Sequence, residues 1–151
     1  TTKRLKDTLL PFVADYPILN PIVKSLHFAD LSGFMKGFID LVFEQDGRFY
    51  IADYKSNWLG TRAENYQQAP LDEAMVAHSY PLQYLIYSLA LHRYLKTRLP
   101  DYDPEQHFGG VYYLFIRGMH PDWGQAGVYF ERPSPALLEA LDLCMSEVGD
   151  V

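Results

Sequence analysis

The dipeptide Asp46-Gly47 lies between two apolar segments and restricts the fold of this chain more than any other feature. Asp-Gly between apolar runs is the strongest short-range signal of a β-hairpin. We therefore expect residues 34–44 and 48–55 to form two antiparallel strands joined by a tight turn at residues 45–48. One strand carries Asp40 and the other carries Asp53, so the hairpin would place two carboxylates on neighbouring strands.

The second strand also carries a lysine close to its carboxylate. Residues two apart on a strand point to the same side, so Asp53 and Lys55 project together and Tyr54 points away. Two adjacent carboxylates favour a hard cation such as Mg²⁺, and Lys55 can offer positive charge to a phosphoryl transition state. The pattern indicates metal-dependent hydrolysis of a phosphodiester. The alternative is a surface ion pair, worth ~0–1 kcal/mol.

A long helix is predicted over residues 82–99, where apolar residues recur at helical spacing. Gln83 and Tyr87 are four positions apart and share one face of it. They are either an ordinary boundary pair or contacts to the site or to DNA. Four aromatic residues are candidates for stacking on unpaired bases, with core packing as the alternative: Trp58, Tyr66, Tyr112 and Tyr113.

The remaining elements predict an α/β fold with a mixed sheet flanked by helices. Ser134 is expected to cap a final helix that starts at Pro135. Residues 1–21 contain three prolines and are expected to be irregular, apart from a helical turn at 5–10. We expect strands at 22–28, 110–117 and 128–130, a short helix at 71–77, and loops at 58–68, 101–107 and 118–127.

Composition excludes several classes of protein. The chain has 151 residues, which suits one domain, and its longest apolar runs are shorter than the ~20 residues of a membrane span. Its single cysteine, Cys144, excludes an internal disulfide and a Cys-rich zinc or iron–sulfur site, and indicates a reducing, cytoplasmic setting. It has neither a P-loop nor a Gly-x-Ser-x-Gly motif, and its histidines are not spaced as zinc ligands. The net charge of −6 argues against strong independent binding of DNA.

Four segments together resemble a known family. They are GFIDLVF at 37–43, DYKSNWLG at 53–60, YLIYSLALHRY at 84–94 and HFGGVYYLFIRG at 107–118. They are similar to the nuclease domain of RecB-type proteins, the beta subunits of exodeoxyribonuclease V (the RecBCD helicase–nuclease). The resemblance extends from about Gly33 to about Leu141. It implies the restriction-endonuclease-like fold of the PD-(D/E)XK nucleases, and an exonuclease or endonuclease active in DNA repair and recombination.

The resemblance also assigns roles to residues. It implies that Asp40, Asp53 and the backbone carbonyl of Tyr54 bind metal, and that Lys55 is catalytic. Gln83 and Tyr87 match the Gln-x-x-x-Tyr motif of the family and join the catalytic set. The implied cofactor is one or two Mg²⁺ ions, with Ca²⁺ able to occupy the site without supporting catalysis. The implied partners are DNA, RecC-like and RecD-like subunits and RecA, with no membrane.

The chain departs from the family before Asp40. RecB-type nucleases carry an upstream histidine ligand and an upstream acidic residue, whereas Asp7, Asp15, His27 and Asp30 stand in no recognisable context. Residues 1–151 are therefore expected to be a single domain, the C-terminal part of a nuclease domain from a longer helicase–nuclease with its ATP site elsewhere. Two alternatives stay open: an AddA-type or phage-type exonuclease, and a weakly active or non-catalytic module for RecA loading or subunit docking.

Overall fold

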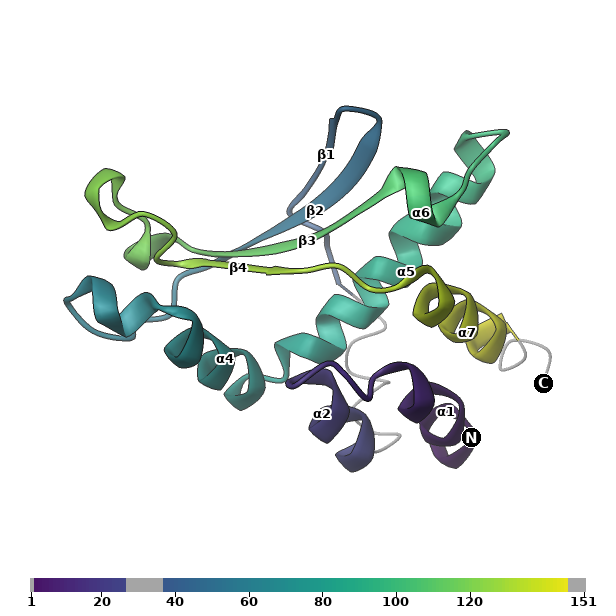
Figure 1. The fold of residues 1–151 in the computed structure, drawn as a ribbon, viewed down its shortest axis with the longest axis horizontal. Helices are drawn as coiled ribbons and strands as arrows, with labels where there is room; N and C mark the ends of the chain where they lie inside the picture. Colours follow the sequence, from purple (N-terminus) through teal and green to yellow (C-terminus); the bar gives the residue numbers. More distant parts are fainter. Residues whose placement is uncertain (1, 27–36, 147–151) are drawn as a thin grey trace.

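The computed structural model describes residues 2–26 and 37–146 of the chain, shown in Figure 1. Four strands form one sheet, and helices of very different lengths accompany it. The strands are β1 (Leu41–Gln45), β2 (Arg48–Lys55), β3 (Phe108–Phe115) and β4 (Val128–Glu131). The α-helices are α1 (Thr2–Leu9), α2 (Leu19–Ser25), α4 (Gln68–Ala77), α5 (Tyr80–Arg98), α6 (Pro104–His107) and α7 (Pro135–Ser146). Short 3₁₀ turns lie at Leu10–Phe12, Ala63–Tyr66, Ile116–Gly118 and Pro121–Trp123.

The sheet is mixed, as expected from the order of the elements, and its strands follow the order β1-β2-β3-β4. β1 and β2 form the expected antiparallel hairpin, in which Asp46 and Gly47 both have positive φ. That conformation is the two-residue turn that an Asp-Gly sequence favours. β3 returns parallel to β2, and β4 closes the sheet antiparallel to β3. The parallel register places β3 beside the whole length of β2.

The long helices lie on one side of the sheet in Figure 1. The opposite, outer face carries aromatic side chains. Rings from all four strands touch in series across that outer face: Phe43 stacks on Tyr50, and Tyr112 contacts both Tyr50 and Phe130. The half-burial of Tyr112 therefore comes from neighbouring rings. Along β3, Tyr113 and Phe115 are fully buried, whereas Tyr112 and Leu114 are half-buried.

Helix α5 is the central helix of the core. The expected helix over 82–99 is confirmed, with bounds Tyr80–Arg98 and Pro81 in its first turn. It is buried on two faces: Leu82, Leu85 and Leu89 meet the other helices, and Leu91 and Leu95 extend the buried surface around the helix. Because α5 packs against the sheet as well as against helices, its buried surface is wider than a single apolar stripe.

The N-terminal segment differs from its prediction. Residues 22–28 were expected to be a strand, but α2 covers Leu19–Ser25, and residues 27 and 28 lie outside the described ranges. The buried positions Leu19, Val23 and Leu26 follow the helical spacing i, i+4, i+7. Pro21 falls in the first turn of α2, where no intrahelical N–H is required. The expected irregular segment before it is also largely helical, as α1 and a 3₁₀ turn.

The remaining expected elements are largely confirmed. The helix expected at 71–77 is α4, which begins three residues earlier, and the loop expected at 101–107 contains the single turn of α6. Ser134 caps α7 as predicted: its Oγ accepts a hydrogen bond from the backbone N of Leu137, 3.1 Å away. Cys144 is buried on α7 and acts as a small apolar side chain. No helix within the described ranges has the length and apolarity to cross a membrane.

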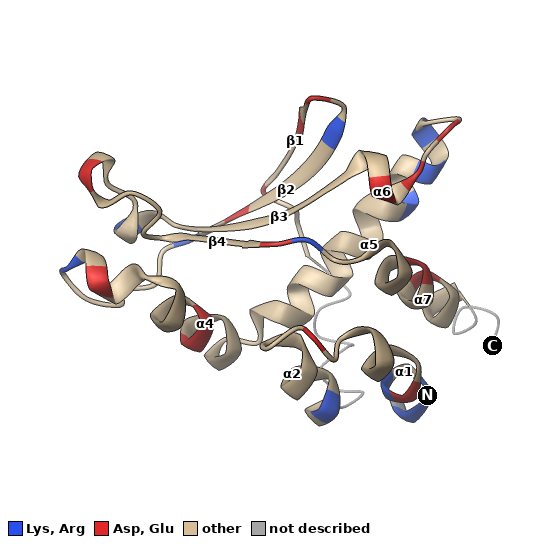
Figure 2. Cartoon of the chain, viewed as in Figure 1, with Lys and Arg blue, Asp and Glu red and all other residues tan. Residues whose placement is uncertain are grey.

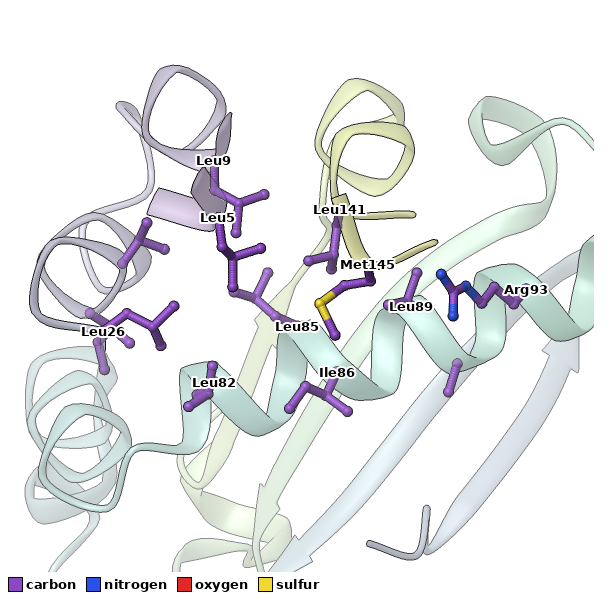
Figure 3. Close-up of a pocket in the computed structure, with 13 residues that line it drawn as sticks. Leu5, Leu9, Leu26, Leu82, Leu85, Ile86, Leu89, Arg93, Leu141 and Met145 are labelled. Carbon is purple, nitrogen blue, oxygen red and sulfur yellow. The ribbon is translucent and has the colours of Figure 1, made fainter. Parts of the chain in front are cut away.

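An apolar cavity of about 200 Å³ lies between α1, α2, α5 and α7. Figure 3 shows that its lining side chains are almost all aliphatic, with Arg93 at one end. The α5 residues that line it, including Leu82, Ile86 and Leu89, stand on a different face of the helix from Gln83 and Tyr87. The cavity is therefore separate from the residues expected to carry the chemistry.

Candidate active site

Strand β2 places Asp53 and Lys55 on the sheet face that α5 covers. Asp53 is only 3 % exposed, and its Oδ2 lies 2.5 Å from Nζ of Lys55. The two side chains therefore form a close, buried ion pair. The side chain of Tyr54 points to the outer face and is half exposed. The prediction that Asp53 and Lys55 project together is confirmed.

Asp40 meets this pair from the start of β1. Leu41 pairs with Ala52, so Asp40 lies across the hairpin from Asp53. Its Oδ2 accepts a hydrogen bond from the backbone N of Tyr54, 2.9 Å away. The strand expected at 34–44 therefore begins only at Leu41. At Asp40 the side chain, and not the backbone, accepts the hydrogen bond from the backbone N–H of Tyr54 in β2. The structure thus brings both carboxylates and the lysine to one edge of the sheet; residues 34–36 lie outside the described ranges.

The electrostatics of Asp53 reflect opposing influences. Burial raises the pKa of Asp53 most strongly, the adjacent Lys55 lowers this pKa, and the negative charge of Asp40 raises it again. The net effect is a pKa above the ordinary carboxyl value. A cation placed between the two carboxylates would relieve both their repulsion and the desolvation of Asp53. The pair is therefore suited to binding a cation.

Gln83 and Tyr87 connect the lysine to the segment that precedes Asp40. The Oε1 atom of Gln83 accepts a hydrogen bond from Lys55 Nζ at 3.0 Å, and its Nε2 donates to the Tyr87 hydroxyl at 3.1 Å. That hydroxyl donates to the carbonyl of Phe38 at 2.8 Å. Burial raises the pKa of Tyr87, which keeps it a neutral donor. Gln83 therefore contacts the site directly, so the pair is more than a boundary pair; its catalytic role stays a prediction.

Two tyrosines that the sequence did not assign to the site surround the lysine. Nζ of Lys55 lies 4.0 Å from the ring centroid of Tyr80 and 5.2 Å from that of Tyr113. The Tyr113 hydroxyl also donates to Oε1 of Gln83, 3.2 Å away. Tyr80 precedes Gln83 by almost one helical turn, and this spacing was the available signal for Tyr80. No local signal pointed to Tyr113, which reaches the site only through the parallel pairing of β2 and β3.

The suggested base-stacking residues divide into two groups. Tyr66 and Tyr113 are fully buried, so the core-packing alternative holds for these two residues. The Tyr66 hydroxyl accepts a hydrogen bond from Leu59 N and donates to the Gly60 carbonyl, which closes the loop after β2. Trp58 in that loop is 63 % exposed, and Tyr112 is half-buried on the outer face. For these two residues the stacking role stays a prediction.

The upstream ligand positions are only partly described. His27 and Asp30 lie outside the described residues. Asp7 lies on α1, which packs against α7 and α2, and Asp15 follows the first 3₁₀ turn; both are exposed. Neither aspartate belongs to the elements that form the site. The described residues therefore supply two carboxylates to the site, and both come from the hairpin.

A second group of potential ligands lies between α5 and α7, away from the hairpin. His92, Glu139 and Asp142 bring one ligand atom each within 4.8 Å of one another. Lys96 already contacts both carboxylates, at 3.2 Å and 2.9 Å, and Arg93 contacts Asp142 at 2.6 Å. Because the two cationic side chains balance the two carboxylates, this group is best described as a salt-bridge network that joins the helices.

We expect the replacement Asp142→Asn to destabilise the chain by about 1–2 kcal/mol at pH 7, because Lys96 and Arg93 lose a charged hydrogen-bond acceptor. Burial tends to raise the pKa of Asp142, but these two cations outweigh it and hold the pKa below the ordinary value of 3.8. The stabilisation should be fully present above pH 3.8 and disappear as the pH falls through the lower folded-state pKa. Urea denaturation of both proteins over this pH range measures the difference. The exposed Asp122→Asn is the control; a difference that persists at the lowest pH would contradict this account.

Comparisons with known proteins agree with this geometry. The family model of the PD-(D/E)XK nuclease superfamily matches residues 5–145. The chain is 53% identical over 117 residues to the RecBCD enzyme subunit RecB of Escherichia coli. This alignment covers 78% of this chain and 10% of that protein. The same subunit of Haemophilus influenzae is 49% identical over 119 residues, and that of Mycolicibacterium smegmatis is 44% identical over 126 residues. These alignments cover 79% and 74% of this chain, and 10% and 11% of those proteins.

The chain spans about a tenth of the length of these curated relatives. The family match, in contrast, includes every residue of the site described above, since all of them lie between residues 5 and 145. The resemblance to RecB nuclease domains, and the fold class it implied, are confirmed. The chain belongs to the PD-(D/E)XK nuclease superfamily.

Proposed function

We propose that this chain is the catalytic part of a Mg²⁺-dependent deoxyribonuclease of the exodeoxyribonuclease V type. One observation carries the proposal: the buried carboxylate of Asp53 lies across the hairpin from the carboxylate of Asp40, and among the described residues Lys55 is its one ion-pair partner. Two carboxylates close together, one of them buried, carry more negative charge than one ammonium balances. A divalent cation would balance the remaining charge.

The residues fit a hard divalent cation. Asp40, Asp53 and the backbone carbonyl of Tyr54 are all oxygen donors, the kind that Mg²⁺ binds. A Mg²⁺ ion held there would polarise a phosphoryl oxygen and acidify a bound water. Asp40 is exposed and Asp53 is buried, so the site opens toward solvent on the Asp40 side. A substrate phosphate would approach from that side.

Lys55 would act on the reacting phosphate itself. In phosphodiester hydrolysis the water oxygen bonds to phosphorus while the bond to the leaving ester oxygen breaks and that oxygen gains a proton. Negative charge builds up on the phosphoryl oxygens, and a fixed ammonium group beside them stabilises it. Gln83 and Tyr87 would position this ammonium, because Gln83 accepts its hydrogen bond and Tyr87 anchors the amide to Phe38.

The proposed setting is a RecBCD-type helicase–nuclease that acts in DNA repair and recombination in the cytoplasm. We propose that the chain is one domain of a longer polypeptide, with RecC-like and RecD-like subunits and RecA as partners. Lys and Arg are spread over several elements in Figure 2 and form no single basic band across the described residues. Together with the net charge of −6, this favours a DNA grip supplied by the rest of the assembly.

Removal of divalent metal tests the proposal. The full-length protein with its subunits should cleave a labelled linear DNA in Mg²⁺, lose cleavage in excess EDTA, and regain it when Mg²⁺ is restored. Ca²⁺ should bind, as measured by calorimetry, without supporting cleavage. Cleavage that persists in EDTA, or its absence in Mg²⁺, would refute a Mg²⁺-dependent nuclease. The interaction-module alternative predicts neither cation binding at Asp40 and Asp53 nor cleavage, and an AddA-type or phage-type enzyme would need no RecC-like subunit.

A further inference from the structure

The ammonium group of Lys55 is held by aromatic surfaces as well as by charge. It lies over the Tyr80 ring at 4.0 Å and near the Tyr113 ring at 5.2 Å, and the Lys55 side chain is only 12 % exposed. The two rings are stacked on each other, with centroids 5.9 Å apart. An ammonium over an aromatic face is attracted by the ring quadrupole, more strongly when water is excluded. We call Tyr80 and Tyr113 the aromatic cradle.

The Tyr80 ring is itself fixed from several sides. Its hydroxyl donates to Oδ1 of Asn57, 3.2 Å away in the loop after β2. His78 stacks on the ring with centroids 5.2 Å apart, in addition to the contact with Tyr113. Tyr113 is fully buried and donates to Gln83, the same amide oxygen that accepts from Lys55. Each of the two rings is therefore held in place by contacts other than the one with the ammonium.

The arrangement matters because the single carboxylate in contact with Lys55 is also the proposed metal ligand. In the described residues, Lys55 has Asp53 as its only ion-pair partner. When a divalent cation takes Asp53, the ammonium loses that attraction and is repelled by the cation. A second carboxylate in place of the rings would bind the lysine firmly but would also neutralise it and repel the substrate phosphate. Neutral aromatic faces bind the ammonium without cancelling its charge.

We infer that the aromatic cradle is a positioning device that holds Lys55 beside the reacting phosphate when a divalent cation occupies Asp53. Tyr80 and Tyr113 are thus positioning residues for Lys55. The catalytic role of the cradle rests on the proposed nuclease function, whereas its contact with Lys55 can be measured without any cleavage. The ring of Tyr80 is the essential feature, and its hydroxyl has a secondary role through Asn57.

Lysine labelling in the full-length protein tests the geometry. The protein is treated with a limiting amount of acetic anhydride in Ca²⁺, and acetylation of Lys55 is measured by mass spectrometry relative to the exposed Lys24. We expect Tyr80→Leu to label Lys55 about tenfold faster than the wild type, since the ammonium loses its ring contact. Tyr80→Phe keeps the ring and should label within twofold of the wild type. Tyr80→Met is measured alongside, because a flexible side chain of similar size guards against misfolding of the leucine variant.

DNA cleavage in Mg²⁺ tests whether the aromatic cradle contributes to catalysis. Tyr80→Leu and Tyr80→Met should lower kcat by about tenfold with KM little changed, and Tyr80→Phe should restore most of the rate. The matched control is Tyr94→Leu, the same substitution on an exposed ring of α5 that contacts Arg98 and not Lys55. It should change neither the labelling nor the rate.

The outcomes separate this inference from the proposed function. If Lys55→Ala cleaves DNA as well as the wild type, the proposed role of the lysine fails, and the labelling still reports whether the cradle holds it. If Lys55→Ala is inactive while folded Tyr80→Leu and Tyr80→Met label and cleave as the wild type does, the cradle is overturned and the nuclease remains. Equal loss in Tyr80→Phe and Tyr80→Leu would also overturn it, because the hydroxyl and not the ring would then be responsible.

Discussion

Replacing Asp53 by asparagine should lower Mg²⁺-dependent DNA cleavage by roughly a thousandfold while leaving the fold intact. The substitution keeps the size of the side chain but removes the buried charge that, on our proposal, binds the cation. Metal-bound charge stabilisation is worth several kcal/mol, and each 1.36 kcal/mol corresponds to a factor of ten in rate. Lys55→Ala should cost on the order of 10²–10³ in kcat, as for other groups that stabilise transition-state charge.

Cleavage assays in the full-length protein, with circular dichroism as the test of folding, measure this effect. The matched control is Asp101→Asn, which makes the same change at an exposed position in the loop after α5. The control should cleave at the wild-type rate. Calorimetry with Ca²⁺ adds a second measurement, in which Asp53→Asn should bind far more weakly than the wild type. Unchanged cleavage by a folded Asp53→Asn protein would remove the basis of the proposed site.

A large loss of stability is expected for Gly110→Ala in β3. Gly110 has φ of +140°, and an added Cβ would lie 2.6 Å from the Phe130 ring and 3.0 Å from the backbone O of Glu131. The disfavoured backbone and the crowding together should cost about 3 kcal/mol. For a chain of this size that corresponds to a fall in melting temperature of roughly 6–12 °C. Thermal denaturation followed by circular dichroism measures it.

Gly47→Ala separates the two contributions. Gly47 also has positive φ, at +76°, but nothing lies within 4 Å of the position its Cβ would take. Only the backbone preference is lost there, so the cost should be about 1 kcal/mol. Equal losses at Gly47 and Gly110 would show that contact with Phe130 contributes nothing, and that the aromatic outer face is looser than the structure indicates.

Local sequence was a good guide wherever one segment decides its own structure. Asp46-Gly47 specifies its turn because both residues tolerate positive φ, and Ser134-Pro135 starts α7 through a side-chain cap. The same approach failed at residues 22–28. Alternation of apolar and polar residues after Pro21 suggested a strand. When Leu19 is included, the buried residues Leu19, Val23 and Leu26 follow helical spacing. In a short apolar segment both periods fit, and the choice depends on the surface against which the segment packs.

The candidate site divides in the same way. The sequence by itself determined that Asp53 and Lys55 share a face and that Asp40 lies across the turn, because strand alternation and a two-residue hairpin are local geometry. It also placed Gln83 and Tyr87 on one face of a helix. Only the tertiary structure decided that Gln83 meets Lys55, and that Tyr80 and Tyr113 enclose its ammonium. Those contacts join residues 25 or more positions apart. They exist only after α5 packs on the sheet and β3 pairs parallel to β2, which no local pattern specifies.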